Sequence, residues 1–237
     1  YGTIDHGRLV RELRFVDGEL VLDEGNVQAA ESLLLARALM NPTVYSHHVA
    51  RIAKAMLRRA AEGLLAAGAT TADELRRMDD HALHAAMREC EATVGYARRL
   101  ERRNLYKRAV WAEMEAVPED ILIAEHDTVR DFERDIADSV NVDPEAVILD
   151  IPSRPEMTES TSRVLVNGDI RELGQQSTLV GALRAAQRDQ WRLGVYAPAD
   201  QSERVGNQAI RTLGLDLDGA LVRDVRPGIN ATLDDFE

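Results

Sequence analysis

Apolar residues recur at the spacing of an amphipathic helix through most of the first hundred positions. The predicted helices cover residues 5–14, 26–40, 42–67 and 92–102, with two short helices that begin at Thr71-Ala72 and at Asp79-Asp80. Asn41-Pro42 predicts a break between two of them, because Asn caps helices well and Pro suits the first helical position. The helix that follows is expected to bury Val49, Ile52, Ala53, Met56, Leu57, Ala60 and Leu64.

The pattern changes after Leu105, where short apolar runs typical of strands alternate with helical segments. We predict strands at residues 105–110, 146–151 and 193–197, helices at 119–137, 178–191 and 200–213, and hairpin turns at Asp17-Gly18 and Asn167-Gly168. The fold class is therefore mostly α, with a helical part over residues 1–110 and a smaller α+β region over 111–215. Residues 216–237 carry little pattern and are expected to form a loosely ordered tail.

The composition limits the kinds of molecule that the protein is expected to bind and the compartment in which it is expected to lie. The 237 residues include 41 Asp and Glu against 29 Lys and Arg, a net charge of -12, which makes nucleic acid an unlikely ligand because its phosphate backbone is repelled. No run reaches the roughly 18 to 20 apolar residues of a membrane span. With one cysteine, Cys90, and no signal segment, the protein is expected to be cytoplasmic. All but two of the basic residues are Arg, which together with the acidic excess predicts a halophilic archaeal host.

Two segments are similar to metal sites, and both are rejected. Asp216-Leu217-Asp218-Gly219 is similar to part of a calcium loop, but Gly214 and Val225 stand where the first and last acidic ligands belong. His126-Asp127 could ligate a divalent metal, yet the residues around it are typical of the polar face of a charged helix. The glycine patterns of phosphate and dinucleotide loops are absent from the sequence as well.

One constellation suggests a binding site. Arg37, Asn41, Tyr45 and His48 follow one another at spacings of four, four and three, so on a continuous helix they share one face. If the chain breaks at Pro42, Arg37 lies in a last helical turn and Tyr45 and His48 lie near the positive start of the next helix. Either arrangement gathers groups that suit a phosphate and a sugar or base. The alternative is an exposed Arg, a Tyr that covers the edge of the core, and surface His residues.

Several stretches of the sequence resemble the HD-domain phosphohydrolases of bacteria and archaea, relatives of the deoxynucleoside triphosphate (dNTP) triphosphohydrolases. The residues that carry this resemblance are 1–10, 16–21, 36–40, 44–51 and 102–108. The likeness is specific over residues 1–67, fair over 100–110 and general in the remainder. It implies that residues 1–110 continue an HD-type helical bundle and that 111–215 form an accessory or oligomerisation domain.

The resemblance also implies a reaction, the hydrolysis of a dNTP to a deoxynucleoside and triphosphate. In the family, a divalent metal such as Mn, Mg or Fe, held by two His and two Asp, activates the attacking water. Those ligands precede the segment that resembles Tyr1, so we expect an upstream segment, no metal or catalytic residue in this chain, and no hydrolysis by it alone. Arg37 matches the Arg that grips the substrate phosphates, and Tyr45 matches the Tyr packed against the sugar.

The family also binds activating nucleotides between subunits, which implies a homo-oligomer with nucleoside triphosphates as ligands. The positions that resemble the effector contacts are Asp5, Arg8, His47, His48, Arg103 and Lys107. His48 stands where relatives can carry Lys, so a phosphate contact there depends on protonation. A second hypothesis is a nucleotide-sensing or oligomerisation module without catalysis. A third, a nucleic-acid-binding module that uses Arg clusters, is disfavoured by the net charge.

Overall fold

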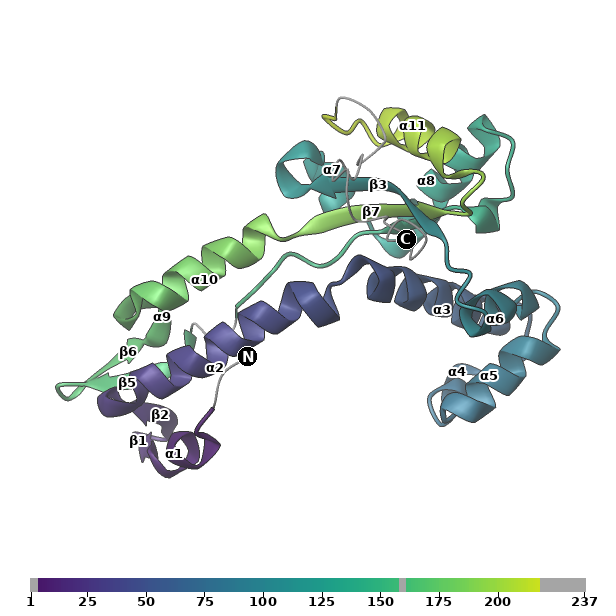
Figure 1. Ribbon diagram of the computed structural model, residues 1–237. Coiled ribbons are helices and arrows are strands. Elements are labelled where there is room, and N and C mark those ends of the chain that lie inside the picture. Colours follow the sequence, from purple (N-terminus) through teal and green to yellow (C-terminus); the bar gives the residue numbers. More distant parts are fainter. Residues whose placement is uncertain (1–3, 158–160, 218–237) are drawn as a thin grey trace, which may run out of the picture. The chain divides into compact units, whose positions relative to one another are not determined.

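The computed structural model describes residues 4–157 and 161–217, which divide into two compact units (Figure 1). One unit comprises residues 1–100 and 152–191, and the other comprises 101–151 and 192–237. The domains predicted from the sequence are continuous segments that meet at residues 110 and 215, whereas each of the two units consists of two separate segments of the chain. Residues 152–191 pack with the first hundred residues because a strand within them joins the N-terminal hairpin in one sheet.

The first unit is mainly helical. Its elements are α1 (His6–Arg11), β1 (Leu13–Val16), β2 (Glu19–Asp23), η1 (Glu24–Asn26), α2 (Val27–Met40), η2 (Asn41–Tyr45), α3 (His48–Ala66), α4 (Ala72–Leu75), α5 (Asp80–Glu89), α6 (Val94–Glu101), β5 (Arg163–Val166), β6 (Asp169–Glu172), α9 (Leu173–Gln176) and α10 (Thr178–Asp189). Both predicted hairpin turns are confirmed. Asp17-Gly18 and Asn167-Gly168 have positive φ at both residues, as a two-residue hairpin turn requires.

The four strands of this unit form a sheet in the order β1-β2-β5-β6. The hairpins β1-β2 and β5-β6 are antiparallel, and β2 pairs with β5 in parallel. The sheet, α2 and α10 share one hydrophobic core. Its buried residues are Leu22, Ala30, Leu34, Met157, Val164, Val166, Leu173 and Val180. This core places α10 beside α2, although about 150 residues separate the two helices in the sequence.

The predicted helix break at Asn41-Pro42 is wrong. The chain remains helical through Tyr45 as a π-turn, in which the Ser46 N–H donates to the Asn41 carbonyl at 2.7 Å. Pro42 has no N–H to donate, and the wider turn relieves the clash that its ring would make in a regular helix. The next helix begins at His48, with His47 rather than Asn41 as its N-cap. Of the predicted buried stripe, Ile52, Met56, Ala60 and Leu64 are buried, whereas Val49, in the first turn, is 44% exposed.

The second unit is a small α+β layer. Its elements are β3 (Lys107–Glu113), η3 (Met114–Ala116), α7 (Glu119–Leu122), α8 (His126–Ser139), η4 (Pro144–Ala146), β4 (Ile148–Asp150), β7 (Arg192–Ala197) and α11 (Ser202–Thr212). The antiparallel sheet has the order β3-β7-β4, and α8 and α11 pack against its strands. The single helix predicted over 119–137 is two helices, α7 and α8, and the chain leaves the helical conformation at residues 123–125.

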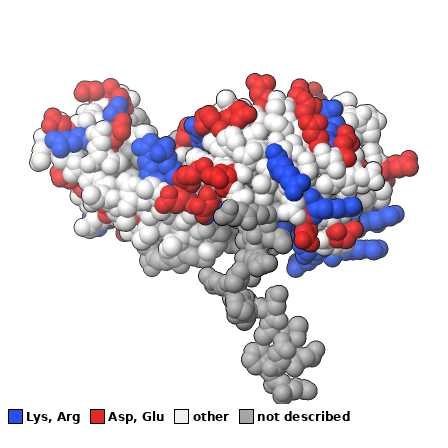
Figure 2. Space-filling view, turned by 90° about the horizontal axis from the view of Figure 1, so that it is seen from above, with Lys and Arg blue, Asp and Glu red and all other residues white. Residues whose placement is uncertain are grey.

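Acidic and basic side chains are interspersed on the face displayed in Figure 2. In the second unit, Glu133 is buried; its Oε2 lies 2.9 Å from Arg130, and its Oε1 accepts from the Leu149 N–H at 2.7 Å. The carboxylate therefore ties α8 to the edge of strand β4. A buried carboxylate is tolerated where its oxygens have such partners.

The fold class predicted from the sequence is confirmed, since the described residues are mostly helical with a smaller α+β region. None of the helices that the structure describes is long and apolar enough to cross a membrane. Most of the proposed tail, from residue 218 onward, lies outside the described residues. The segment Asp216-Leu217-Asp218-Gly219, which is similar to a calcium loop, also extends into these residues.

Candidate functional site

Arg37, Asn41 and Tyr45 line one pocket, as expected from their spacing on a continuous helix. The π-turn explains why this alignment survives Pro42. In a turn closed by an i to i+5 bond, more residues fit into each turn, so a step of four stays nearly in line. The Thr43 hydroxyl adds a bond to the Leu39 carbonyl at 2.8 Å, which supports the turn where Pro42 donates nothing. Single π-turns inside helices occur often at functional sites.

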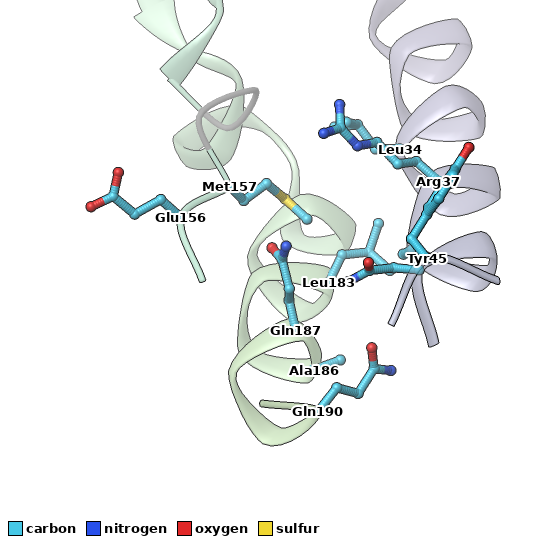
Figure 3. Close-up of a pocket in the computed structure, with 11 residues that line it drawn as sticks. Leu34, Arg37, Tyr45, Glu156, Met157, Leu183, Ala186, Gln187 and Gln190 are labelled. Carbon is cyan, nitrogen blue, oxygen red and sulfur yellow. The ribbon is translucent and has the colours of Figure 1, made fainter. Parts of the chain in front are cut away.

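The pocket has a volume of about 530 Å³ and two walls (Figure 3). The first wall is α2 with its π-turn, and the second is α10 with the segment that precedes β5. The lining residues are Leu34, Arg37, Ala38, Asn41, Tyr45, Glu156, Met157, Leu183, Ala186, Gln187 and Gln190. All of them belong to the first unit, and the volume lies within the range of roughly 300 to 1,000 Å³ of small-molecule sites.

A hydrogen bond fixes the second wall against the first. Ser177, the N-cap of α10, donates its hydroxyl to Glu31 on α2 and accepts from the Val180 N–H at 3.1 Å. Figure 1 shows that α2 and α10 run in the same direction. The bond joins the two helices near their N-terminal ends, since Ser177 is the N-cap of α10 and Glu31 lies in the first half of α2.

The chemistry of the lining is polar and cationic at the α2 side. Arg37 is exposed and contributes the guanidinium, whereas the Glu156 carboxylate points away from the other lining residues in Figure 3. Tyr45 is 55% exposed, so a face of its ring is accessible to a ligand. Three amides, of Asn41, Gln187 and Gln190, complete the polar groups. A guanidinium, a phenol and amides around an apolar floor suit an anion that carries a ring.

The second wall, which supplies six of the eleven lining residues, was missed by sequence reasoning. Leu183, Ala186, Gln187 and Gln190 follow the helical period along one face of the predicted helix 178–191, but no motif links that face to residues 37–45. The link is tertiary, through the shared core and the Ser177 bond. His48 was expected on the pocket face and is not among the lining residues, because it begins the helix beyond the π-turn.

Two of the expected effector residues hold α1 in place. Asp5 is the N-cap of α1 and accepts from the Arg8 N–H at 2.8 Å. The Arg8 guanidinium donates to Asn26 Oδ1 at 2.6 Å and to the Gly25 carbonyl at 3.0 Å, so it connects α1 to the start of α2. These bonds give both residues a local structural role and hold the guanidinium in one orientation.

The other four effector candidates lie elsewhere. His47 caps α3 through Nδ1, and its ring centroid lies 4.3 Å from that of His48. Both follow the C-terminal end of α2, whereas Arg8 lies at its start, and the 14 residues of that helix rise by about 21 Å. Arg103 and Lys107 are exposed and belong to the second unit.

The described residues do not fit a metal ion. No group of three or more His, Cys, Asp and Glu within residues 4–157 and 161–217 is arranged to hold one. His126 and Asp127 lie at the N-terminal end of α8, and no such group includes them.

The family model of the HD associated region matches residues 4–224. The chain belongs to this family. An uncharacterized curated relative of the HD-associated chain, MJ1154 from Methanocaldococcus jannaschii, is 27% identical over 228 residues, which are 89% of this chain and 48% of the relative. The chain thus spans about half the length of the curated relative it matches.

Two solved structures share the fold of this HD-associated chain. A hypothetical protein from Aquifex aeolicus has a TM-score of 0.62 at 20% identity, over 88% of this chain and 52% of that protein. A phosphohydrolase from Bacteroides thetaiotaomicron has a TM-score of 0.56 at 16% identity, over 83% of this chain and 56% of that protein. At these identities the likeness concerns the fold.

Proposed function

We propose that this chain supplies the substrate-binding part of a metal-dependent phosphohydrolase that converts a dNTP to a deoxynucleoside and triphosphate. The observation that carries the proposal is that Arg37 and Tyr45 line one pocket. Membership of the HD-associated family and the fold shared with a phosphohydrolase support the reaction class. The dNTP as substrate rests on the resemblance of these two residues to the family's substrate contacts.

The spacing of the two side chains suits a nucleotide. Arg37 and Tyr45 are separated by at most about 12 Å along the helix axis, and a triphosphate joined to a sugar can bridge that distance. Arg37 would bind terminal phosphate oxygens, since a guanidinium offers paired donors. The accessible face of Tyr45 would pack on the deoxyribose. These groups bind and orient, and the hydrolytic chemistry belongs to an upstream segment with a divalent metal.

The positions of the effector candidates support a homo-oligomer. Asp5 and Arg8 lie near the start of α2 and His47 and His48 beyond its end, so a nucleotide cannot touch both pairs within one chain. A site that combines them therefore needs a second copy of the chain. Arg103 and Lys107 would add phosphate contacts to such a site, and a cytoplasmic location would supply the nucleoside triphosphates.

The test is to incubate the full-length protein with each dNTP and Mn²⁺ or Mg²⁺ and to measure inorganic triphosphate. Arg37→Ala should lower kcat/KM at least about tenfold, the effect of losing one charge-assisted phosphate contact, with an unchanged melting temperature, since Arg37 is exposed. Arg58→Ala, an exposed Arg on α3 outside the pocket, should change neither. Nucleotide binding without triphosphate release would favour a nucleotide-sensing module, and equal losses of activity and stability would contradict the role of Arg37.

A further inference from the structure

Asn41 is the middle residue of the wall that α2 and its π-turn contribute to the pocket. Arg37, Asn41 and Tyr45 all line the pocket, and each step of four residues rises by at most about 6 Å along the helix axis. In the proposed binding mode, Arg37 binds the terminal phosphates and Tyr45 packs on the sugar. That binding mode puts the phosphate that is joined to the sugar at the level of Asn41.

Ser46 holds Asn41 through two hydrogen bonds. Its N–H donates to the Asn41 carbonyl at 2.7 Å, and its hydroxyl donates to Asn41 Oδ1 at 3.1 Å. In a regular α-helix, side chains three or four positions apart are neighbours, whereas side chains five apart face different directions. The π-turn is closed by a bond between residues five apart, so it brings these two side chains to the same side.

The bond to the hydroxyl determines which end of the Asn41 amide is available to a ligand. An amide has an acceptor oxygen and a donor NH₂ group on opposite sides of its carbon atom. Since Ser46 holds the oxygen, the NH₂ group is the end that Asn41 offers to the pocket. Two N–H donors one helical turn from Arg37 suit phosphate oxygens, which accept hydrogen bonds from such groups.

We propose that Ser46 is a positioning residue for substrate binding, which orients the Asn41 amide so that its N–H groups donate to the phosphate joined to the sugar. This inference rests on the proposed function, and it adds a third contact to the wall formed by Arg37 and Tyr45. Ser46 is not among the lining residues of the pocket, so it acts through Asn41. Without the hydroxyl the amide can rotate, and binding then has to order it, which weakens the affinity.

The test uses the full-length protein and two ligands, deoxyadenosine monophosphate (dAMP) and deoxyadenosine, which differ only in that phosphate. Calorimetry measures Kd for both. Ser46→Ala should weaken dAMP binding about three- to tenfold, the effect of ordering one side chain, and leave deoxyadenosine binding unchanged. Ser46→Thr keeps a hydroxyl and should restore the affinity for dAMP.

Ser32→Ala is the matched control. Like Ser46, Ser32 is exposed and donates its hydroxyl within the helix, to the Gln28 carbonyl at 2.9 Å, but it bonds to no residue that lines the pocket. Ser32→Ala should therefore change the affinity for neither ligand.

Two variants of Asn41 separate positioning from a purely structural role of Ser46. Asn41→Ala should weaken dAMP binding about tenfold or more, the range of a hydrogen bond to a charged group. Adding Ser46→Ala to it should cause no further loss, because the residue that Ser46 positions is gone. Asn41→Asp keeps an acceptor for the Ser46 hydroxyl but has no N–H donor, and its carboxylate repels the phosphate. It should weaken dAMP binding at least as much as Asn41→Ala does.

Three results would overturn the role of Ser46: equal weakening of both ligands by Ser46→Ala, an unchanged affinity of Ser46→Ala for dAMP, or full affinity for dAMP in Asn41→Asp. Each leaves the proposed function standing as long as the unmodified protein releases triphosphate from a dNTP. If it releases none from any dNTP and binds dAMP no more tightly than deoxyadenosine, the proposed function is wrong and the role of Ser46 falls with it.

Discussion

The bond between Ser177 and Glu31 should hold the two walls of the pocket in register, and its removal can be measured. Ser177 is 3% exposed, and its hydroxyl both caps α10 and donates to the Glu31 carboxylate. Ser177→Ala loses a helix cap, which costs about 1 kcal/mol. It also loses a hydrogen bond to a charged group, which costs about 1.5 to 3 kcal/mol. We therefore expect the free energy of unfolding to fall by about 2.5 to 4 kcal/mol.

The double-mutant cycle isolates the shared bond. Glu31→Ala should lower the free energy of unfolding by about 1.5 to 3 kcal/mol. The double variant should lower it by little more than Ser177→Ala does, because the bond can be lost only once. Glu31→Gln keeps an acceptor and should cost less than Glu31→Ala. The coupling free energy is expected to be about 1.5 to 3 kcal/mol.

Urea unfolding followed by tryptophan fluorescence provides the assay. The chain has two tryptophans, and Trp191, buried next to α10, reports on the first unit when Trp111 is replaced by Phe. If the costs of the two single variants add to within about 0.3 kcal/mol, the bond does not couple the helices and the reasoning is refuted. Where coupling is found, Ser177→Ala should also weaken nucleotide binding, because α10 loses the bond that holds it against α2.

Two further predictions concern helices α3 and α4 of the first unit. Gly63→Ala should destabilise the protein by about 1 to 3 kcal/mol, because its Cβ would lie 2.8 Å from Thr93 Cγ2, which is buried. The control Gly181→Ala, which meets nothing within 4 Å, should stabilise in the same urea assay. A backbone hydrogen bond from Thr71 lowers the pKa of Glu74 below its ordinary value. The stabilising effect of the carboxylate is therefore present above the ordinary pKa of Glu and is lost as the pH falls through the lower, folded-state pKa, so Glu74→Gln should remove that part of the acid sensitivity. A titration by NMR that finds the Glu74 pKa at or above the ordinary value would contradict the capping box.

Local chemistry in the sequence was sufficient to predict most of the elements. The capping box of Thr71 and Glu74, the Asp79 cap and both hairpin turns form as predicted, because each depends on residues within a few positions of one another. The spacing of Arg37, Asn41 and Tyr45 predicted a common face for the same reason. The interpretation of Asn41-Pro42 as a break was wrong, because a π-turn can accommodate Pro42 without ending the helix.

Only the tertiary structure decided what faces these residues. The second wall of the pocket comes from α10, and the contact depends on the parallel pairing of β2 with β5 and on the bond from Ser177 to Glu31. These partners are more than 100 residues apart, and the apolar pattern of a helix states which face is buried but not against which helix. The sequence therefore determined the elements and one face of the site, whereas the two-walled pocket exists only because distant segments share one core.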